Sequence, residues 1–154
     1  MIAHLENRVP PPLVLLITLV LMYGLALLDP YSINADTTLK SGAVLMALLG
    51  FTCMLSGAYS FRQAKTTVNP LRPDKASSLV RSGMFRYTRN PMYLGMLLIA
   101  LGWMLYLASA LSALGVIAFA VYIQRLQILP EERAMQALFG AEFADYKAST
   151  RRWL

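Results

Sequence analysis

The sequence predicts an all-α protein, an integral-membrane bundle of four transmembrane helices followed by a C-terminal amphipathic helix. Apolar residues make up 57% of the 154 residues and charged residues only 14%, whereas roughly a quarter of a soluble domain is charged. Several uncharged runs are long enough to cross a hydrocarbon core. The net charge of +6 lies between these runs, which is typical of a cytoplasmic membrane face and does not indicate a nucleic-acid partner. We expect one domain, residues 1–154.

The first two spans are expected at residues 10–28 and 42–61. Proline suits the first turn of a helix, so Pro10-Pro11-Pro12 can start the first run, and Asp29-Pro30 ends it. No clear cleavage site precedes that end, so we interpret the run as a retained span. The second run contains Cys53, the only cysteine, which we interpret as a buried thiol. It also contains small residues that allow close helix packing, namely Gly42, Gly50, Ser56 and Gly57.

The segment from Arg62 to Arg89 has seven basic residues and one acid, and its Pro70 and Pro73 break a continuous helix. The positive-inside rule places this segment in the cytoplasm. An alternative is that some of its charges only set the topology and meet anionic lipid headgroups. We favour that interpretation for Arg62, Lys65, Arg72 and Lys75.

Residues 90–124 carry no charge over 35 positions. One helix of that length would measure roughly 52 Å, far more than a bilayer core requires. We therefore predict a hairpin of two spans, 91–107 and 111–128, with a turn between Leu107 and Ser112. The hairpin returns the chain to the basic side, so both termini are expected in the cytoplasm.

Beyond the hairpin, Pro130-Glu131-Glu132 resembles a helix start, because carboxylates are favoured at the positive helix end. Apolar residues at spacings of three and four then predict an amphipathic helix, broken at Gly140. Arg151-Arg152-Trp153 is interpreted as an interfacial anchor. The apolar positions are Met135, Leu138, Phe139, Phe143 and Tyr146.

The sequence lacks a phosphate-binding glycine loop, a serine nucleophile motif and a histidine pair for a metal, so no metal site is expected. The spans contain almost no mid-membrane polar groups, which argues against a channel or transporter. The chemically capable residues flank the hairpin. An arginine can bind a carboxylate or phosphate, and a glutamate can accept from hydroxyls or attract a cation. These groups would suit S-adenosylmethionine. They are Arg89, Asn90, Tyr93, Glu131 and Glu132.

Each of these residues also has a purely structural interpretation. Arg89 could be an interfacial arginine and Tyr93 an aromatic-belt residue. Glu131 and Glu132 could be ordinary first-turn carboxylates of a helix. His4, the only histidine, is interpreted as solvated or interfacial.

Between Ser77 and Tyr146 the sequence resembles the integral-membrane methyltransferases of the isoprenylcysteine carboxyl methyltransferase and phospholipid N-methyltransferase superfamily. The resemblance rests on Leu79–Phe85, Arg89–Gly95, Glu131-Glu132 and Leu138–Tyr146, in that order around the hairpin. It implies that cytoplasmic elements 77–95 and 125–148 bind S-adenosylmethionine. The implied cofactor contacts are Ser77, Ser78, Leu79, Val80, Phe85, Arg89, Asn90, Tyr93 and Glu131.

Two departures from the family pattern concern the substrate. Asn90 stands where the carboxyl methyltransferases have a histidine, which favours the phospholipid-type branch. A substrate-side arginine expected before the acidic pair falls near Gln127, and Arg125 is the nearest basic residue.

The expected reaction is methyl transfer from S-adenosylmethionine to a lipophilic acceptor, a phospholipid amine or a prenylcysteine-like carboxylate. Arg89 or Arg125 would hold an acidic head group, and Glu132 or Tyr93 would take a proton from an amine. Membrane lipids are the expected partners, with no obligate protein partner, in a bacterial or archaeal plasma membrane. The alternatives are an NADPH-dependent membrane reductase and a non-catalytic scaffold.

Overall fold

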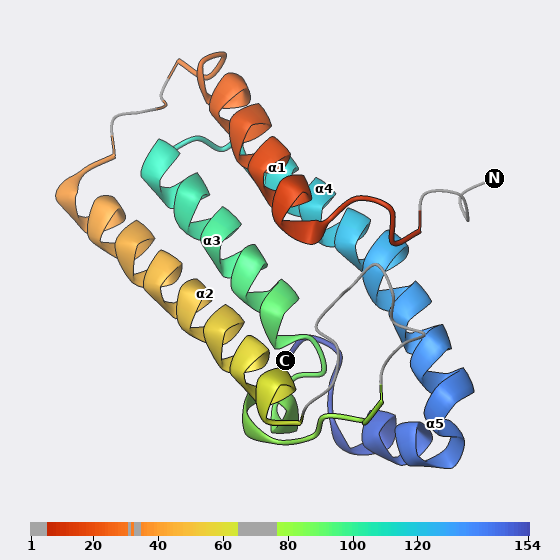
Figure 1. The fold of residues 1–154 in the computed structure, drawn as a ribbon. Helices are drawn as coiled ribbons and strands as arrows, with labels where there is room; N and C mark the ends of the chain where they lie inside the picture. The colour runs from red at the N-terminus through yellow and green to blue at the C-terminus, as the bar shows by residue number, and fades with distance from the viewer. Residues whose placement is uncertain (1–5, 31, 33–34, 65–76) are drawn as a thin grey trace.

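The protein is all-helical over the residues that the computed structural model describes, 6–30, 32, 35–64 and 77–154 (Figure 1). The predictions for His4, Lys65, Arg72 and Lys75 lie outside these residues. The all-α fold class is confirmed, because no strand occurs in the described part of the chain. The elements are α1 (Pro11–Ala26), α2 (Thr37–Gln63), the 3-10 turn η3 (Gly83–Arg86), α3 (Pro91–Leu107), α4 (Ala113–Ile123), the π-helical turn η4 (Gln124–Ile128) and α5 (Leu129–Ser149).

The helix ends follow local signals in the sequence. Prolines occupy the first turns of α1 and α3, where the missing N–H costs nothing. α2 begins earlier than predicted because the Asp36 carboxylate accepts from the N–H of Leu39 at 2.8 Å and caps the helix. α3 ends at Leu107, where Ala108 adopts a left-handed conformation. The chain then enters α4, so the predicted hairpin turn is present.

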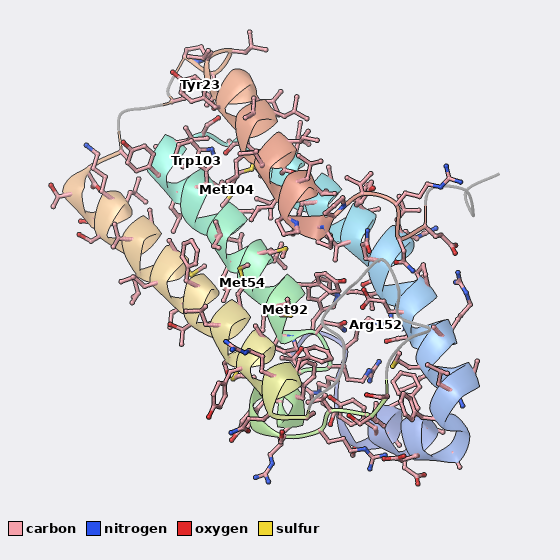
Figure 2. All side chains as sticks on the ribbon, viewed as in Figure 1. Tyr23, Met54, Met92, Trp103, Met104 and Arg152 are labelled. Atoms are coloured by element: carbon pink, nitrogen blue, oxygen red, sulfur yellow. The ribbon has the colours of Figure 1, made fainter. Side chains whose placement is uncertain are left out.

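α3 lies in the middle of the bundle, packed along α2 on one side and against α1 and α4 on the other (Figure 1). α2 and α3 approach each other closely at Gly50 and Gly95, where a Cβ added to Gly50 would lie 2.5 Å from the Gly95 carbonyl oxygen. Met54 and Met92 lie along the same seam (Figure 2). Small residues therefore set the distance between these helices.

At the end of the bundle away from the basic segments, two polar contacts between described residues join the helices. The Ser109 hydroxyl, in the α3–α4 turn, donates to Asp29 at the end of α1 over 2.8 Å. The Trp103 indole of α3 donates to the Leu19 carbonyl of α1 over 3.0 Å. Both contacts attach the hairpin to α1, which leaves the opposite end for the charged residues.

Large apolar side chains cover the outer faces of the bundle, which suits a lipid solvent. By length and composition, α2 and the continuous helix 113–149 are long and apolar enough to cross a membrane, while α1 and α3 are shorter apolar helices. Exposed examples on α1 and α2 are Leu16, Val20, Leu21, Val44, Leu48 and Leu55.

α5 continues α4 through the π-helical turn η4. Pro130 lies in the first turn of α5, as predicted, but Ile128 before it is already helical. Because proline has no N–H, the carbonyl of Leu126, four residues earlier, loses its normal helical donor. The backbone N–H of Asn7 replaces it at 3.0 Å. The N-terminal segment thus completes the junction between η4 and α5.

α5 breaks at Gly140, which has φ 50° and ψ −120°, as the sequence predicts. Its last part lies beneath the bundle (Figure 1). There Phe143 and Tyr146 are buried against Val80 and Phe85. Of the predicted apolar face, Met135 and Phe139 also pack here, whereas Leu138 is exposed.

Candidate functional site

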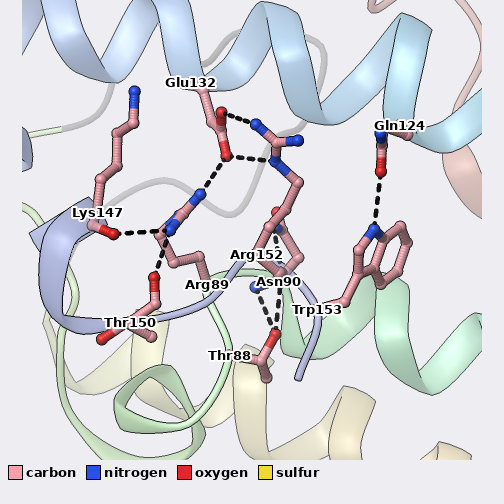
Figure 3. Close-up of polar contacts among 9 residues, drawn as sticks. All are labelled: Thr88, Arg89, Asn90, Gln124, Glu132, Lys147, Thr150, Arg152 and Trp153. Atoms are coloured by element: carbon pink, nitrogen blue, oxygen red, sulfur yellow. Dashed lines mark hydrogen bonds and ion pairs between the residues drawn. The ribbon is translucent and has the colours of Figure 1, made fainter.

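The segment before α3 and the first turn of α5 meet through Arg89 and Glu132, which are 43 positions apart in the sequence. Arg89 Nη2 donates to Glu132 Oε1 at 2.8 Å, and the two side chains are only 10% and 12% exposed (Figure 3). A guanidinium in this position is not an interfacial arginine directed at lipid headgroups. The two segments that sequence analysis expected beneath the hairpin therefore do lie together.

Arg152 places a second guanidinium on the same carboxylate. Its Nε donates to Glu132 Oε1 at 2.9 Å and its Nη2 to Oε2 at 2.8 Å, a two-pronged contact. Burial raises the pKa of Glu132, but hydrogen bonds from Arg152 and Arg89 and their charges outweigh it, so the net pKa is lowered. Glu132 is therefore ionised at neutral pH, and both its oxygens are occupied.

The C-terminal segment 150–153 is fixed against the start of α3 by several contacts. The carbonyl of Arg152 accepts from Asn90 Nδ2 at 2.9 Å and from Thr88 Oγ1 at 3.2 Å. The Arg89 N–H donates to the Arg151 carbonyl at 2.9 Å. The Arg89 guanidinium also donates to the carbonyls of Thr150 and Lys147. The Trp153 indole donates to the side chain of Gln124 at 2.9 Å (Figure 3).

Sequence reasoning missed this segment. A terminal Arg-Arg-Trp is typical of a membrane-surface anchor, but Arg152 and Trp153 turn inward and contact the site. Only Arg151 keeps an exposed side chain of that kind. The sequence gives only a weak signal for this contact, because Arg151 and Arg152 are adjacent and nothing local shows which of them pairs with Glu132.

Glu131 has an environment unlike that of its neighbour. The hydroxyl of Tyr93, a residue 7% exposed, donates to Glu131 Oε1. The pKa of Glu131 is raised to about 8, chiefly by burial. The charge of Glu132 also raises this pKa, whereas the hydrogen bond from Tyr93 lowers it. At neutral pH the folded protein thus holds Glu131 mostly protonated beside an ionised Glu132. Adjacent carboxyls with divergent pKa values are typical of acid–base sites.

Among the described residues, three buried side-chain polar atoms have no hydrogen-bond partner: Asn7 Oδ1, Arg89 Nε and Gln127 Oε1. Gln127 is fully buried, and its Nε2 donates to the Val9 carbonyl at 2.9 Å. The position where a substrate-side arginine was expected therefore holds the N-terminal segment. Buried groups without partners are rare in native proteins, so these atoms mark candidate ligand or water positions.

The remaining predicted residues divide into two groups. Val80 and Phe85 are buried in the aromatic cluster with α5, where the Tyr146 hydroxyl donates to the Phe85 carbonyl at 2.6 Å. Leu79 packs against the same cluster. The Ser78 hydroxyl donates to the Ala64 carbonyl at 3.3 Å, while Ser77 is exposed.

Arg125 is exposed on η4 and is not among the contacts of Glu132.

Sequence comparison with known proteins points to a methyltransferase family. The phospholipid methyltransferase family matches residues 39–142, about two thirds of the chain. An uncharacterised protein of Haemophilus influenzae is 48% identical over 63 residues, covering 41% of this chain and all of that protein. Protein-S-isoprenylcysteine O-methyltransferase B of Arabidopsis thaliana is 29% identical over 106 residues, covering 67% of this chain and 50% of the plant protein. No solved structure matches.

A bundle of apolar helices with a charged cluster beneath one hairpin is typical of a membrane protein, and the family match gives its class as a methyltransferase. The chain belongs to the phospholipid methyltransferase family, within the superfamily that the sequence motifs indicated. It spans only about half of the plant relative, so that relative's activity is not transferred to it directly.

Proposed function

We propose that the protein transfers a methyl group from S-adenosylmethionine to a lipophilic acceptor at the cytoplasmic face of a membrane. The observation that supports this most directly is the meeting of Arg89 and Tyr93 with Glu132 and Glu131 beneath the α3–α4 hairpin. Family membership supplies the reaction class. The site geometry supports a ligand with both cationic and anionic groups.

The residues present fit such a donor. Arg89 has a buried Nε without a partner, which suits an anionic group. Glu131 can accept from a hydroxyl or an ammonium group, and the partly buried Leu79, Met135 and Phe139 beside the cluster around Phe85 offer apolar surface to a ring. When bound, S-adenosylmethionine supplies a methyl group activated by a positively charged sulfur. Arg89, Asn90, Tyr93, Glu131 and the 77–85 segment are the proposed contacts.

The chain's own residues would align the reactants and handle a proton. Transfer of a methyl group depends chiefly on proximity and orientation in a water-poor site. A neutral amine acceptor must be available, and Glu131, whose pKa is raised to about 8, can take a proton in the fraction of molecules in which it is ionised, a fraction that grows as pH rises. Glu132, named in the sequence analysis, is poorly suited because two guanidiniums occupy it. A carboxylate acceptor needs no base.

The acceptor would reach the site from the bilayer. The outer faces of α1 and α2 are apolar, whereas the Arg89–Glu132 end is charged. A lipid lying beside the hairpin would therefore bring its head group to the charged end. The positive-inside rule supports a cytoplasmic location for that end and for both termini. A phospholipid amine and a prenylcysteine-like carboxylate both have this architecture.

Calorimetry in detergent with S-adenosylmethionine and with its demethylated product tests the proposal. We expect the wild type to bind both and Glu131→Ala to bind each at least tenfold more weakly. Glu142→Ala, an exposed carboxylate on the same helix, is the matched control. No binding by the folded wild type would overturn the proposal. Stabilisation by NADPH alone would instead support the reductase alternative, and radiolabelled methyl transfer to lipid extracts would identify the acceptor.

A further inference from the structure

The charged cluster of Arg89, Glu132 and Arg152 is not electrically balanced. Two guanidiniums share one carboxylate, so the cluster carries one excess positive charge. Arg89 is held at 10% exposure and Glu132 at 12%, so water screens this excess less than it would at a surface. A buried, uncompensated positive charge favours an anion.

The cluster also has N–H groups that are not used. Arg89 Nε is buried and has no partner. Arg152 uses its Nε and Nη2 on Glu132, and its Nη1 makes no hydrogen bond with any described residue. The Arg152 side chain is 32% exposed, so a ligand can reach it. Two guanidiniums with free donors can bind the oxygens of a carboxylate or phosphate.

The position of Arg152 is fixed before any ligand arrives. Asn90 and Thr88 hold its carbonyl, and Trp153 is held by Gln124. A guanidinium on a restrained backbone loses less conformational freedom on binding than a mobile surface arginine does. Figure 2 shows the Arg152 side chain in the region between the lower end of α3 and α5. These contacts favour a binding role over that of a loose anchor.

We propose that Arg152 and Arg89, bridged by Glu132, form an oxyanion-binding site for a carboxylate or a phosphate, which the C-terminal segment completes. This inference rests on the proposed function only for the identity of the molecule that carries the anionic group. The carrier is either the amino-acid end of the methyl donor or the phosphate of a lipid acceptor. In both cases Arg152, and not the exposed Arg125, is the second arginine of the site.

Thermal unfolding of the full chain in detergent, with inorganic phosphate against chloride at equal ionic strength, tests the site directly. We expect phosphate to stabilise the wild type and Arg152→Gln to need about tenfold more phosphate for the same shift. Arg151→Gln, an exposed neighbour, is the matched control and stays within about twofold of wild type. Equal behaviour of the two variants, or no phosphate effect beyond chloride in the wild type, would overturn the proposal.

Glu132→Gln distinguishes binding from a merely structural role. Removing the carboxylate leaves two guanidiniums without a counter-charge, so the phosphate-dependent shift should become larger than in the wild type. If Glu132 only supports the fold, the shift would be unchanged or smaller, which counts against the site. Arg152→Lys keeps the positive charge but not the forked donors of the guanidinium. It is the second variant to be measured if Arg152→Gln does not fold. We expect an intermediate shift from it.

Two further titrations identify the carrier. If the donor supplies the anion, the wild type prefers S-adenosylmethionine over decarboxylated S-adenosylmethionine, and Arg152→Gln loses that preference. If the lipid supplies it, Arg152→Gln weakens binding of a short-chain phosphatidic acid about tenfold and leaves donor binding unchanged. An Arg152→Gln protein that binds all three ligands like the wild type overturns the inference. Phosphate binding without any donor binding would contradict the proposed function alone.

Discussion

The hydroxyl of Tyr93, in the first turn of α3, donates a hydrogen bond to the carboxyl of Glu131 in the first turn of α5. The adjacent Glu132 is instead bound by Arg89 and Arg152. The two consecutive carboxyl groups therefore have different environments. Glu131 accepts from a neutral hydroxyl, whereas Glu132 is bound by two guanidinium cations. Their different protonation states lead to separate predictions.

Activity toward an amine acceptor should depend on Glu131. Because burial raises its pKa to about 8, the fraction of carboxylate able to take a proton grows as pH rises toward 8. We expect kcat/KM to rise from pH 6 through pH 8 and to level off only at about pH 9. Glu131→Gln should remove the rise and lower the rate by about 10²–10⁴-fold, the usual contribution of a general base. Glu142→Gln should retain the wild-type profile, and an unaltered rise in Glu131→Gln would contradict this role.

Stability should also depend on pH through Glu131. Its folded pKa is about 8 and its ordinary value is 4.5, so between these values the unfolded chain has released a proton that the folded chain keeps. Stability therefore falls as pH rises through this window. Glu132 has a lowered pKa, and its contribution is already complete above pH 4.5. Thermal midpoints from pH 5 to 8 should fall in the wild type and fall less in Glu131→Gln; identical slopes would refute the assignment.

Arg89→Met should loosen the C-terminal segment. The substitution removes the bond to Glu132 and the bonds to the carbonyls of Thr150 and Lys147. Hydrogen bonds of a charged group typically contribute about 1.5–3 kcal/mol, so we expect a loss of that order. Limited proteolysis should then cut near residue 150 faster. Arg86→Met, at an exposed position, should change stability by less than about 0.5 kcal/mol.

Gly95→Ala should separate α2 from α3. The added Cβ would meet the Gly50 carbonyl and the side chain of Met54, both backed by packed helices. Overpacking of this kind typically costs about 1–3 kcal/mol. Gly24→Ala in α1 is the matched control, since its Cβ would meet nothing within 4 Å, and alanine is the better helix former by about 1 kcal/mol. Equal thermal midpoints for the two variants would show that the seam is not tightly packed.

Features encoded by neighbouring residues could be predicted from the sequence. Pro91 and the uncharged run after it define α3, and Gly140 breaks α5. The cluster at Arg89 and Glu132 was also accessible, because a hairpin must bring its two flanking segments to one side. In each case the signal lies within a few residues or in the length of one apolar run.

Features that depend on contacts distant in the sequence could not be predicted. Arg152 and Arg151 are adjacent and chemically identical, yet one is held by Glu132 and the other is exposed. Only the path of the chain after Gly140 separates their roles. Likewise, nothing local distinguishes Glu131 from Glu132, because the partners that shift their pKa values come from α3 and from the C-terminal segment.

The hydrogen bond from the Asn7 N–H to the Leu126 carbonyl has a dynamic consequence. The Leu126 carbonyl lies five residues before Glu131 and six before Glu132. It is the carbonyl whose helical donor is missing because Pro130 has no N–H. A tilt of the first turn of α5 must therefore break this bond or carry residues 6–10 with it. Amide hydrogen exchange at Asn7 would then act as a remote sensor of the acidic pair: ligands that immobilise Glu131 and Glu132 should slow deuterium uptake at the opposite end of the polypeptide.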